Sequence, residues 1–238
     1  SRGLGDVYKR QLLDTPGHVD FSAEMERTLQ VLDYAVLVIS GADGVQGHTL
    51  TLWSLLERYK IPTFLFINKM DQDGTQKDQL LKELQERLSS GCIDFGEKGS
   101  DEFYEMIAME DEALLDHYLE SGEITESKIR EMIAERKIFP CFFGSALKLQ
   151  GVNEFLSDFA FYTEEREYPE EFGARIFKIT RDENGNRLTH LKVTGGNLKV
   201  KTVITERDEK INQIRIYSGE KYETVNELQA GRICAVTG

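Results

Sequence analysis

Acidic, amide and histidine side chains occur at two places where apolar runs of the sequence end. The first is Asp14-Thr15-Pro16-Gly17-His18, which follows two leucines, and the second is Asn68-Lys69-Met70-Asp71, which follows the run IPTFLFI. A carboxylate can accept hydrogen bonds from a base or hold a cation. Glycine lets backbone amides approach a phosphate, and histidine can handle a water molecule near neutral pH. Together these are the residue types that a nucleotide site requires.

The stretch Asn68-Lys69-Met70-Asp71 suits the recognition of guanine. Guanine differs from adenine by its N1–H and 2-amino donors, and the single carboxylate of Asp71 can accept from both. Opposite adenine the same carboxylate would stay unpaired, at a cost of about 1–3 kcal/mol or more. Asn68 can brace the loop and reach the base edge, while the stem of Lys69 can cover the base face.

A later apolar run, FPCFF, ends in Gly144-Ser145-Ala146. The hydroxyl of Ser145 and the backbone amide of Ala146 can complete the guanine pocket at O6. Taken alone, an N-K-x-D pattern occurs often by chance. The alternative for this stretch is therefore an ordinary turn between a strand and a helix, with polar caps.

The stretch from Asp14 to His18 suits the phosphate side of such a site. Asp14 can hold Mg²⁺, and we expect it to do so through a water molecule, because Mg²⁺ keeps several waters and takes few carboxylates. Gly17 lets its N–H approach a γ-phosphate without a Cβ in the way. His18 can position the attacking water. The alternatives are a histidine on a loop and a plain Pro-Gly turn.

Strands alternating with helices predict an α/β domain with a parallel sheet over residues 12–166. The strands are expected over 34–40, 61–68 and 139–146, with a further strand ending at Asp14. The continuous apolar run over 34–40 is typical of a strand buried on both faces. The helices are expected between 41 and 60 and over 75–88, 111–120, 126–136 and 152–162. Since parallel strands present their carboxyl ends at one edge, the polar residues above should gather there.

After Tyr168-Pro169 the pattern changes to short strands separated by turns. Asn184-Gly185 between two alternating stretches is a strong hairpin signal. Further short strands follow to the end of the chain, which predicts a small antiparallel β-barrel over residues 167–238.

The composition limits the remaining possibilities. The 238 residues carry a formal net charge of −13, without the basic footprint usual for nucleic-acid binders. No apolar stretch approaches the roughly 20 residues of a membrane span, and we expect a cytoplasmic protein with no membrane partner. The three cysteines suit neither a disulfide framework nor a zinc site.

Taken together, these motifs give the sequence a close resemblance to the translational GTPases. LLDTPGHVDFSAEMERTLQVLDYAVLVISGADGVQ resembles the elongation factor G branch, and INKMDQDG, DEALLDHYLESGEI and FPCFFGSALKLQGVNEFL extend the match. KMDQDG and the short insert between motifs are most similar to the tetracycline-resistance ribosomal protection proteins. The resemblance covers about residues 12–238, including a second domain similar to the family's β-barrel.

The resemblance implies a role for each candidate residue. His18 is implied as the catalytic histidine, and Asp14 and Gly17 as switch residues that sense the γ-phosphate and Mg²⁺. The remaining implied GTP-binding residues are Thr15, Pro16, Asn68, Lys69, Asp71, Ser145 and Ala146. The implied cofactors are GTP and Mg²⁺. The implied partner of the monomeric factor is the ribosome, through the sarcin–ricin loop of the large-subunit RNA and the stalk, and resistance members dislodge tetracycline from it.

One family motif, G-x-x-x-x-G-K-[ST], is absent from the printed sequence. In the family, the strand before it lies between the strand ending at Asp14 and the strand over 34–40. We therefore expect an incomplete P-loop-NTPase-type sheet, with two inner strand edges left unpaired or forced together. We further expect an internal section of a longer GTPase, with a truncated barrel, a non-native leader over 1–11, weak or no GTP binding and no hydrolysis.

The alternative is a complete, non-catalytic binding module that kept the fold and lost the nucleotide. The retained Asp14, His18, Asn68 and Asp71 argue against it, because such a module has no physical use for that set.

Overall fold

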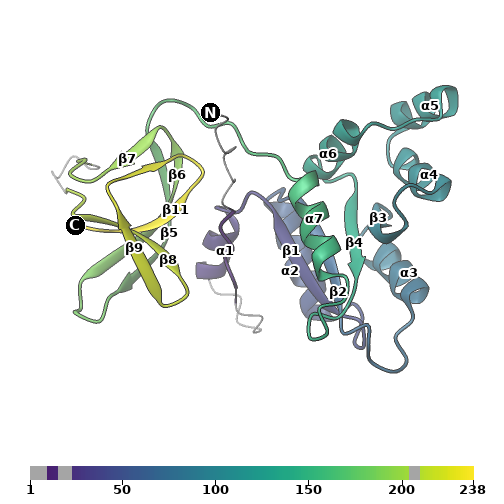
Figure 1. Cartoon of the computed structure of the whole chain (residues 1–238), viewed down its shortest axis with the longest axis horizontal. Helices are drawn as coiled ribbons and strands as arrows, with labels where there is room; N and C mark the ends of the chain where they lie inside the picture. The colour runs from purple at the N-terminus through teal and green to yellow at the C-terminus, as the bar shows by residue number, and fades with distance from the viewer. Residues whose placement is uncertain (1–9, 16–22, 204–209) are drawn as a thin grey trace, which may run out of the picture. The chain divides into compact units, whose positions relative to one another are not determined.

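The computed structural model describes residues 10–15, 23–203 and 210–238. The chain divides into two compact units, one formed by Leu32–Glu165 and the other by Ser1–Val31 together with Arg166–Gly238 (Figure 1). The first unit contains a parallel sheet, and the second contains antiparallel strands. The domain division expected from the sequence stays a prediction. In the structure, the described residues before Leu32 group with the antiparallel unit.

The parallel unit has four strands in the order β1-β2-β4-β3. The strands are β1 (Ala35–Ser40), β2 (Thr63–Asn68), β3 (Cys92–Asp94) and β4 (Phe139–Phe143). The helices are α2 (Gly47–Arg58), α3 (Lys77–Arg87), α4 (Asp101–Met109), α5 (Glu112–Ser121), α6 (Glu126–Ala134) and α7 (Val152–Tyr162), with a 3₁₀ turn η1 (Phe95–Glu97). The predicted α/β class is thereby confirmed.

Strand β2 explains how the sheet is covered on both faces. Successive side chains of a strand point to opposite faces. Phe64 and Phe66 pack in the core formed with α4, α6 and α7, whereas Leu65 and Ile67 pack in the core formed with α2 and α3. Figure 1 shows α7 on one face of the sheet and α2 on the other. All four side chains are buried, so this strand is held from both sides.

Strand β1 differs from the expectation of burial on both faces. Its side chains alternate in burial, and Val38 is 59% exposed. Leu37 and Ile39 are buried beside α2, and Val36 packs partly against the other core. The face of β1 that carries Val38 is therefore open to solvent at this position. The prediction was wrong at this position, because an apolar run in the sequence does not show whether a helix is present to cover it.

The strand expected to end at Asp14 is not formed. Residues 10–15 are described without strand structure, and β1 pairs only with β2 among the described strands. A strand requires a neighbour for its backbone N–H and C=O groups. The neighbour expected from the family, the strand before the phosphate motif, is not in the printed sequence. Of the two outcomes expected for the inner edges, the unpaired one is seen for β1 among the described strands, and the second edge has no strand to test it.

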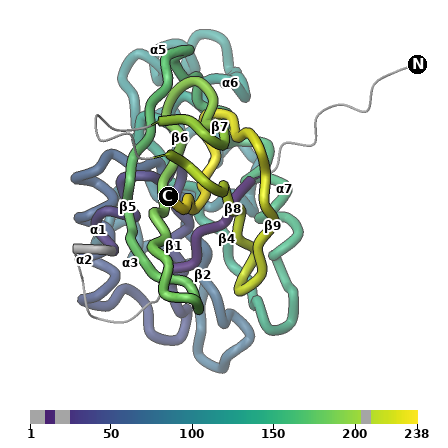
Figure 2. The backbone as a smooth tube through the Cα atoms, turned by 90° about the vertical axis from the view of Figure 1, so that its left-hand side faces the viewer, coloured from purple at the N-terminus to yellow at the C-terminus, as the bar shows by residue number. Residues whose placement is uncertain are grey.

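The antiparallel unit contains a five-stranded sheet in the order β5-β6-β11-β8-β9 and a two-stranded ribbon of β7 and β10. The strands are β5 (Gly173–Arg181), β6 (Arg187–Gly195), β7 (Asn197–Lys199), β8 (Gln213–Ser218), β9 (Lys221–Val225), β10 (Glu227–Gln229) and β11 (Ile233–Thr237). The hairpin of β5 and β6 turns at Gly185, where φ is +80°, as the Asn-Gly signal predicted. The green segment of Figure 2 follows this hairpin.

The described N-terminal residues contact this second unit. Helix α1 (Ala23–Leu29) lies against β5. The side-chain amide of Gln11 donates to the carbonyl of Ile233 at 2.8 Å and accepts from its N–H at 2.7 Å, so it pairs with the backbone of β11 as a strand would. No helix in the described part of the chain has the length and apolar character needed to cross a membrane.

Candidate functional site

Three strand ends meet at the carboxyl edge of the parallel sheet. Ser40 and Asn68 are paired in register at the ends of β1 and β2, and the Gly41 N–H donates to the Asn68 carbonyl at 2.7 Å. From β4, the Gly144 N–H donates to the Ile67 carbonyl at 2.9 Å. The backbone therefore joins the residues that follow these three strands at one place.

The side chain of Asn68 connects two loops of this edge. Its Oδ1 accepts from the N–H of Lys69 and from the N–H of Ala146, both at 2.8 Å. The second of these bonds spans 78 residues of sequence. In the opposite direction, the Met70 N–H donates to the Gly144 carbonyl at 3.0 Å. Asn68 thus acts as a clamp between the Asn68–Asp71 turn and the loop that contains Ser145 and Ala146.

The carboxylate of Asp71 has two partners from the same loop. The Ser145 hydroxyl donates to it, and the Lys148 ammonium lies 3.2 Å from its Oδ2. The Ser145 hydroxyl oxygen also accepts from the backbone N–H of Lys148 at 3.3 Å. The Ser145 bond, followed by the Lys148 contact, holds the pKa of Asp71 below its ordinary value of 3.8. Asp71 is therefore a fixed, ionised acceptor at neutral pH.

Glycine makes the tight path of the 144–151 loop possible. A Cβ added at Gly144 would lie 2.3 Å from the Gln150 carbonyl oxygen and 3.1 Å from the Phe66 ring. Ser145 and Gln150 exchange two backbone hydrogen bonds of 3.0 Å each. On the facing turn, Lys69 has φ +63°, in the left-handed region. Backbone strain of this kind concentrates at functional sites, although it does not identify a ligand.

The structure brings together Asn68, Asp71, Ser145 and Ala146, with the exposed Lys69 on the same turn. Asp14 and Thr15 belong to the other unit. Pro16, Gly17 and His18 lie outside the described residues, so the assigned roles of these three remain predictions.

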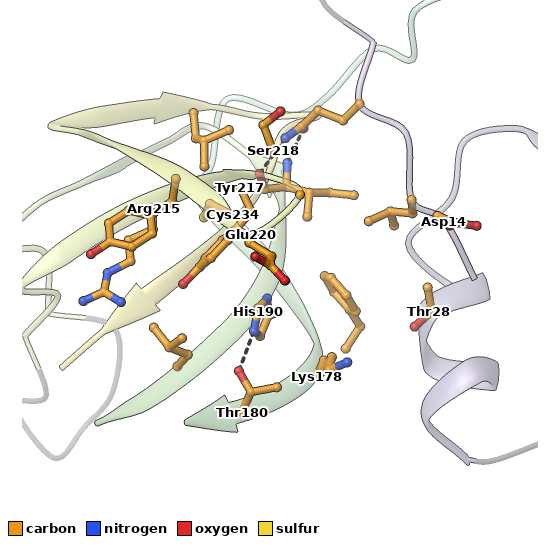
Figure 3. Close-up of a pocket in the computed structure, with 18 of the residues that line it drawn as sticks. Asp14, Thr28, Lys178, Thr180, His190, Arg215, Tyr217, Ser218, Glu220 and Cys234 are labelled. Carbon is orange, nitrogen blue, oxygen red and sulfur yellow. Dashed lines mark hydrogen bonds between the residues drawn. The ribbon is translucent and has the colours of Figure 1, made fainter. Parts of the chain in front are cut away.

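A cavity of about 1100 Å³ in the antiparallel unit is lined partly by Asp14 and Thr15 (Figure 3). The cavity is also lined by His190 and Tyr217 from the five-stranded sheet. The His190 ring is held by Thr180, whose hydroxyl oxygen lies 2.8 Å from Nε2. The Asn68 turn and the Ser145 loop are not part of this lining.

Sequence reasoning missed Lys148, the ion-pair partner of Asp71. It also missed Gln150, which closes the loop opposite Ser145. A signal for Lys148 was present in the sequence, as a cation three residues after Ser145. The distance between Lys148 and Asp71 could not be inferred, because it depends on how two strand ends meet.

A parallel sheet packed between helices, with an N-K-x-D turn joined to a G-S-A loop at its carboxyl edge, has the architecture of the P-loop-NTPase class. The model of the elongation factor Tu GTP binding domain family matches residues 5–165. The chain belongs to this family of translation GTPases. The resemblance noted in the sequence is thereby confirmed.

Several known proteins are similar to this chain over most of its length. Elongation factor G of Aquifex pyrophilus is 29% identical, with 98% of this chain and 44% of the relative covered. Tetracycline resistance protein TetO of Campylobacter jejuni is 32% identical, with 91% of this chain and 37% of the relative covered. A crystal structure of a Thermus thermophilus protein matches with a TM-score of 0.79 at 22% identity, covering 94% of this chain and 41% of that one. The chain spans less than half the length of these relatives.

Proposed function

We propose that this chain supplies the guanine-recognition part of the GTP site in a GTP-hydrolysing translation factor that acts on the ribosome. The observation that supports this proposal most is the bond from the Ala146 N–H to Asn68, which holds the Asp71 turn and the Ser145 loop together. These loops supply the base-edge groups that a guanine pocket requires. Membership of a GTP-binding family supports the same ligand.

Each of these residues has a defined task in the proposed pocket. Asp71 accepts from guanine N1–H and from the 2-amino group, which requires the carboxylate to be ionised, and its lowered pKa meets that requirement. Asn68 holds the loops at a fixed separation. The side chain of Lys69 covers the base face. Ser145 and the Ala146 amide complete the pocket near O6.

For the phosphate side we propose the roles suggested by the sequence. Asp14 holds Mg²⁺ through a water, Gly17 brings its backbone N–H to the γ-phosphate, and His18 positions the attacking water, with Thr15 and Pro16 as further GTP-binding residues. Across residues 10–15, 23–203 and 210–238, no group of three or more His, Cys, Asp and Glu side chains is placed to hold a metal ion. A single carboxylate nonetheless suits Mg²⁺ that takes its other ligands from phosphate and water.

The action of the whole protein is part of the proposal. Because the relatives include elongation factor G and tetracycline resistance proteins, we propose that the parent factor hydrolyses GTP on the ribosome and that ribosomal protection against tetracycline is its specific task. Growth of bacteria that carry the full gene on tetracycline tests that second statement. No increase in resistance would leave general elongation as the function.

Nucleotide titration followed by amide NMR tests the base site in the chain itself. We expect GTP to shift the signals of Lys69 and Ala146, the two amides bonded to Asn68. Base contacts without the triphosphate cradle should give only millimolar affinity, about −4 kcal/mol. ATP at the same concentration controls for phosphate and should leave both signals in place. Equal shifts with both nucleotides would contradict the recognition of guanine. No shift with either nucleotide would favour a module that has lost nucleotide binding.

A further inference from the structure

Lys148 holds the carboxylate that the proposed function assigns to guanine. Its ammonium lies 3.2 Å from Asp71 Oδ2. An ammonium group is a hydrogen-bond donor only, as are the N1–H and 2-amino groups of guanine. Lys148 therefore makes, within the protein, the same kind of contact with Asp71 that guanine would make.

The two partners of Asp71 differ in burial. Ser145 is 1% exposed, so its hydroxyl meets the carboxylate from inside the protein. The Lys148 side chain is 54% exposed and the Asp71 side chain 19% exposed. The ammonium thus covers the carboxylate from the solvent side, and a base arrives from solvent. Guanine, which pairs with both carboxylate oxygens, therefore competes with Lys148 from the solvent side, whereas the Ser145 bond can persist.

We infer that Lys148 is a specificity-determining residue that occupies Asp71 in the free protein and competes with the two donors of guanine for the carboxylate oxygens. This inference rests on the proposed function, because it assigns a regulator to the same site. An exposed ion pair is weak, which makes Lys148 displaceable. It lowers the affinity for guanine without preventing binding.

Competition has a consequence for other bases. Hypoxanthine has the N1–H of guanine but lacks the 2-amino group, so it engages one carboxylate oxygen and leaves the other to Lys148 when inosine triphosphate binds. The contact between Lys148 and Asp71 is lost when guanosine triphosphate binds and is kept when inosine triphosphate binds. Lys148 therefore reduces the preference of the site for GTP over ITP.

The test is NMR titration of Lys148→Met with GTP and with ITP. Removal of an exposed pair of this kind should raise the GTP affinity by about two- to fivefold and leave the ITP affinity unchanged. The ratio of the two affinities removes any effect of Lys148 on the phosphates, which both ligands share. Lys148→Arg keeps a cation opposite Asp71 and should retain the original ratio.

Lys82→Met serves as a matched control, because Lys82 is an exposed lysine of α3 that pairs with Glu86 at 3.7 Å. It should change neither affinity. A Lys148→Met protein that loses affinity for both nucleotides equally would show that Lys148 only orients Asp71 and would overturn the inference, as would an unchanged ratio. With either of these results, the proposed function would stand as long as the unsubstituted protein prefers GTP to ATP. If it showed no such preference, both would fall.

Discussion

The clamp formed by Asn68 gives the sharpest prediction for the architecture of the site. Asn68→Ala removes the acceptor for two backbone N–H groups, those of Lys69 and Ala146. A hydrogen bond of this type contributes about 0.5–1.5 kcal/mol net. Both bonds lie at the surface, where water can replace the lost acceptor, so the lower half of that range applies. We expect the free energy of unfolding to fall by about 1–2 kcal/mol.

Asn68→Asp is the matched variant, because it has the same shape and keeps an acceptor oxygen at the position of Oδ1. We expect it to lose less than half of what Asn68→Ala loses, with the added charge near Asp71 as its main cost. Urea denaturation followed by Trp53 fluorescence measures both. Trp53 is the only tryptophan; it is 7% exposed and packs against Phe139 in the same unit. An alanine variant as stable as the original, or an aspartate variant equally destabilised, would refute the clamp.

Three further predictions concern the same unit and the buried thiols. Gly144→Ala should lower the free energy of unfolding by about 1–3 kcal/mol, because the added Cβ would meet the Gln150 carbonyl oxygen. Gly47→Ala is the control: its added Cβ would have no atom within 4 Å, so the free energy of unfolding should change by less than about 1 kcal/mol. Equal urea midpoints of the two variants would contradict this. The three cysteines, Cys92, Cys141 and Cys234, are buried, and burial also raises the pKa of the Cys141 thiol and raises that of Cys234 to about 12. Because a reagent cannot reach buried thiols, a thiol reagent at pH 8 should label none of the three until urea is added. Rapid labelling of the native protein would disprove this. The Ser145 bond and then the Lys148 contact hold the pKa of Asp71 below 3.8. The ionised Asp71 should therefore stabilise the fold above that pH, and this contribution should be lost as the pH falls through the lowered pKa. A difference in stability between the unsubstituted protein and Asp71→Asn that persists unchanged in strong acid would contradict this.

Much of the parallel sheet could be predicted from the sequence, because buried strands are continuous apolar runs. The run IPTFLFIN became β2, with both faces covered. Short elements were harder: β3 contains three residues, and its pairing with β4 depends on contacts distant in sequence. Helix α4 was also missed, although Ser100 caps its N-terminus by accepting from the Phe103 N–H.

The candidate site was predictable in composition but not in all its contacts. Asn68, Asp71 and Ser145 could be named because each follows an apolar run, and parallel strands bring their carboxyl ends to one edge. Lys148 could not, since its distance from Asp71 is set by the path of the 144–151 loop. The exposure of Val38 was equally invisible, because it depends on which neighbouring elements are present.

The most direct test of the central claim is a change in base preference on replacement of Asp71. Xanthine has a carbonyl where guanine has the 2-amino group, so an amide at residue 71 can donate to xanthine as the carboxylate accepts from guanine. We predict that Asp71→Asn shifts preference from GTP to xanthosine triphosphate in the NMR titration, whereas Asp73→Asn, the same change two residues along the turn, leaves GTP preferred. If Asp71→Asn kept the original ratio of the two affinities, Asp71 would not be the residue that recognises guanine.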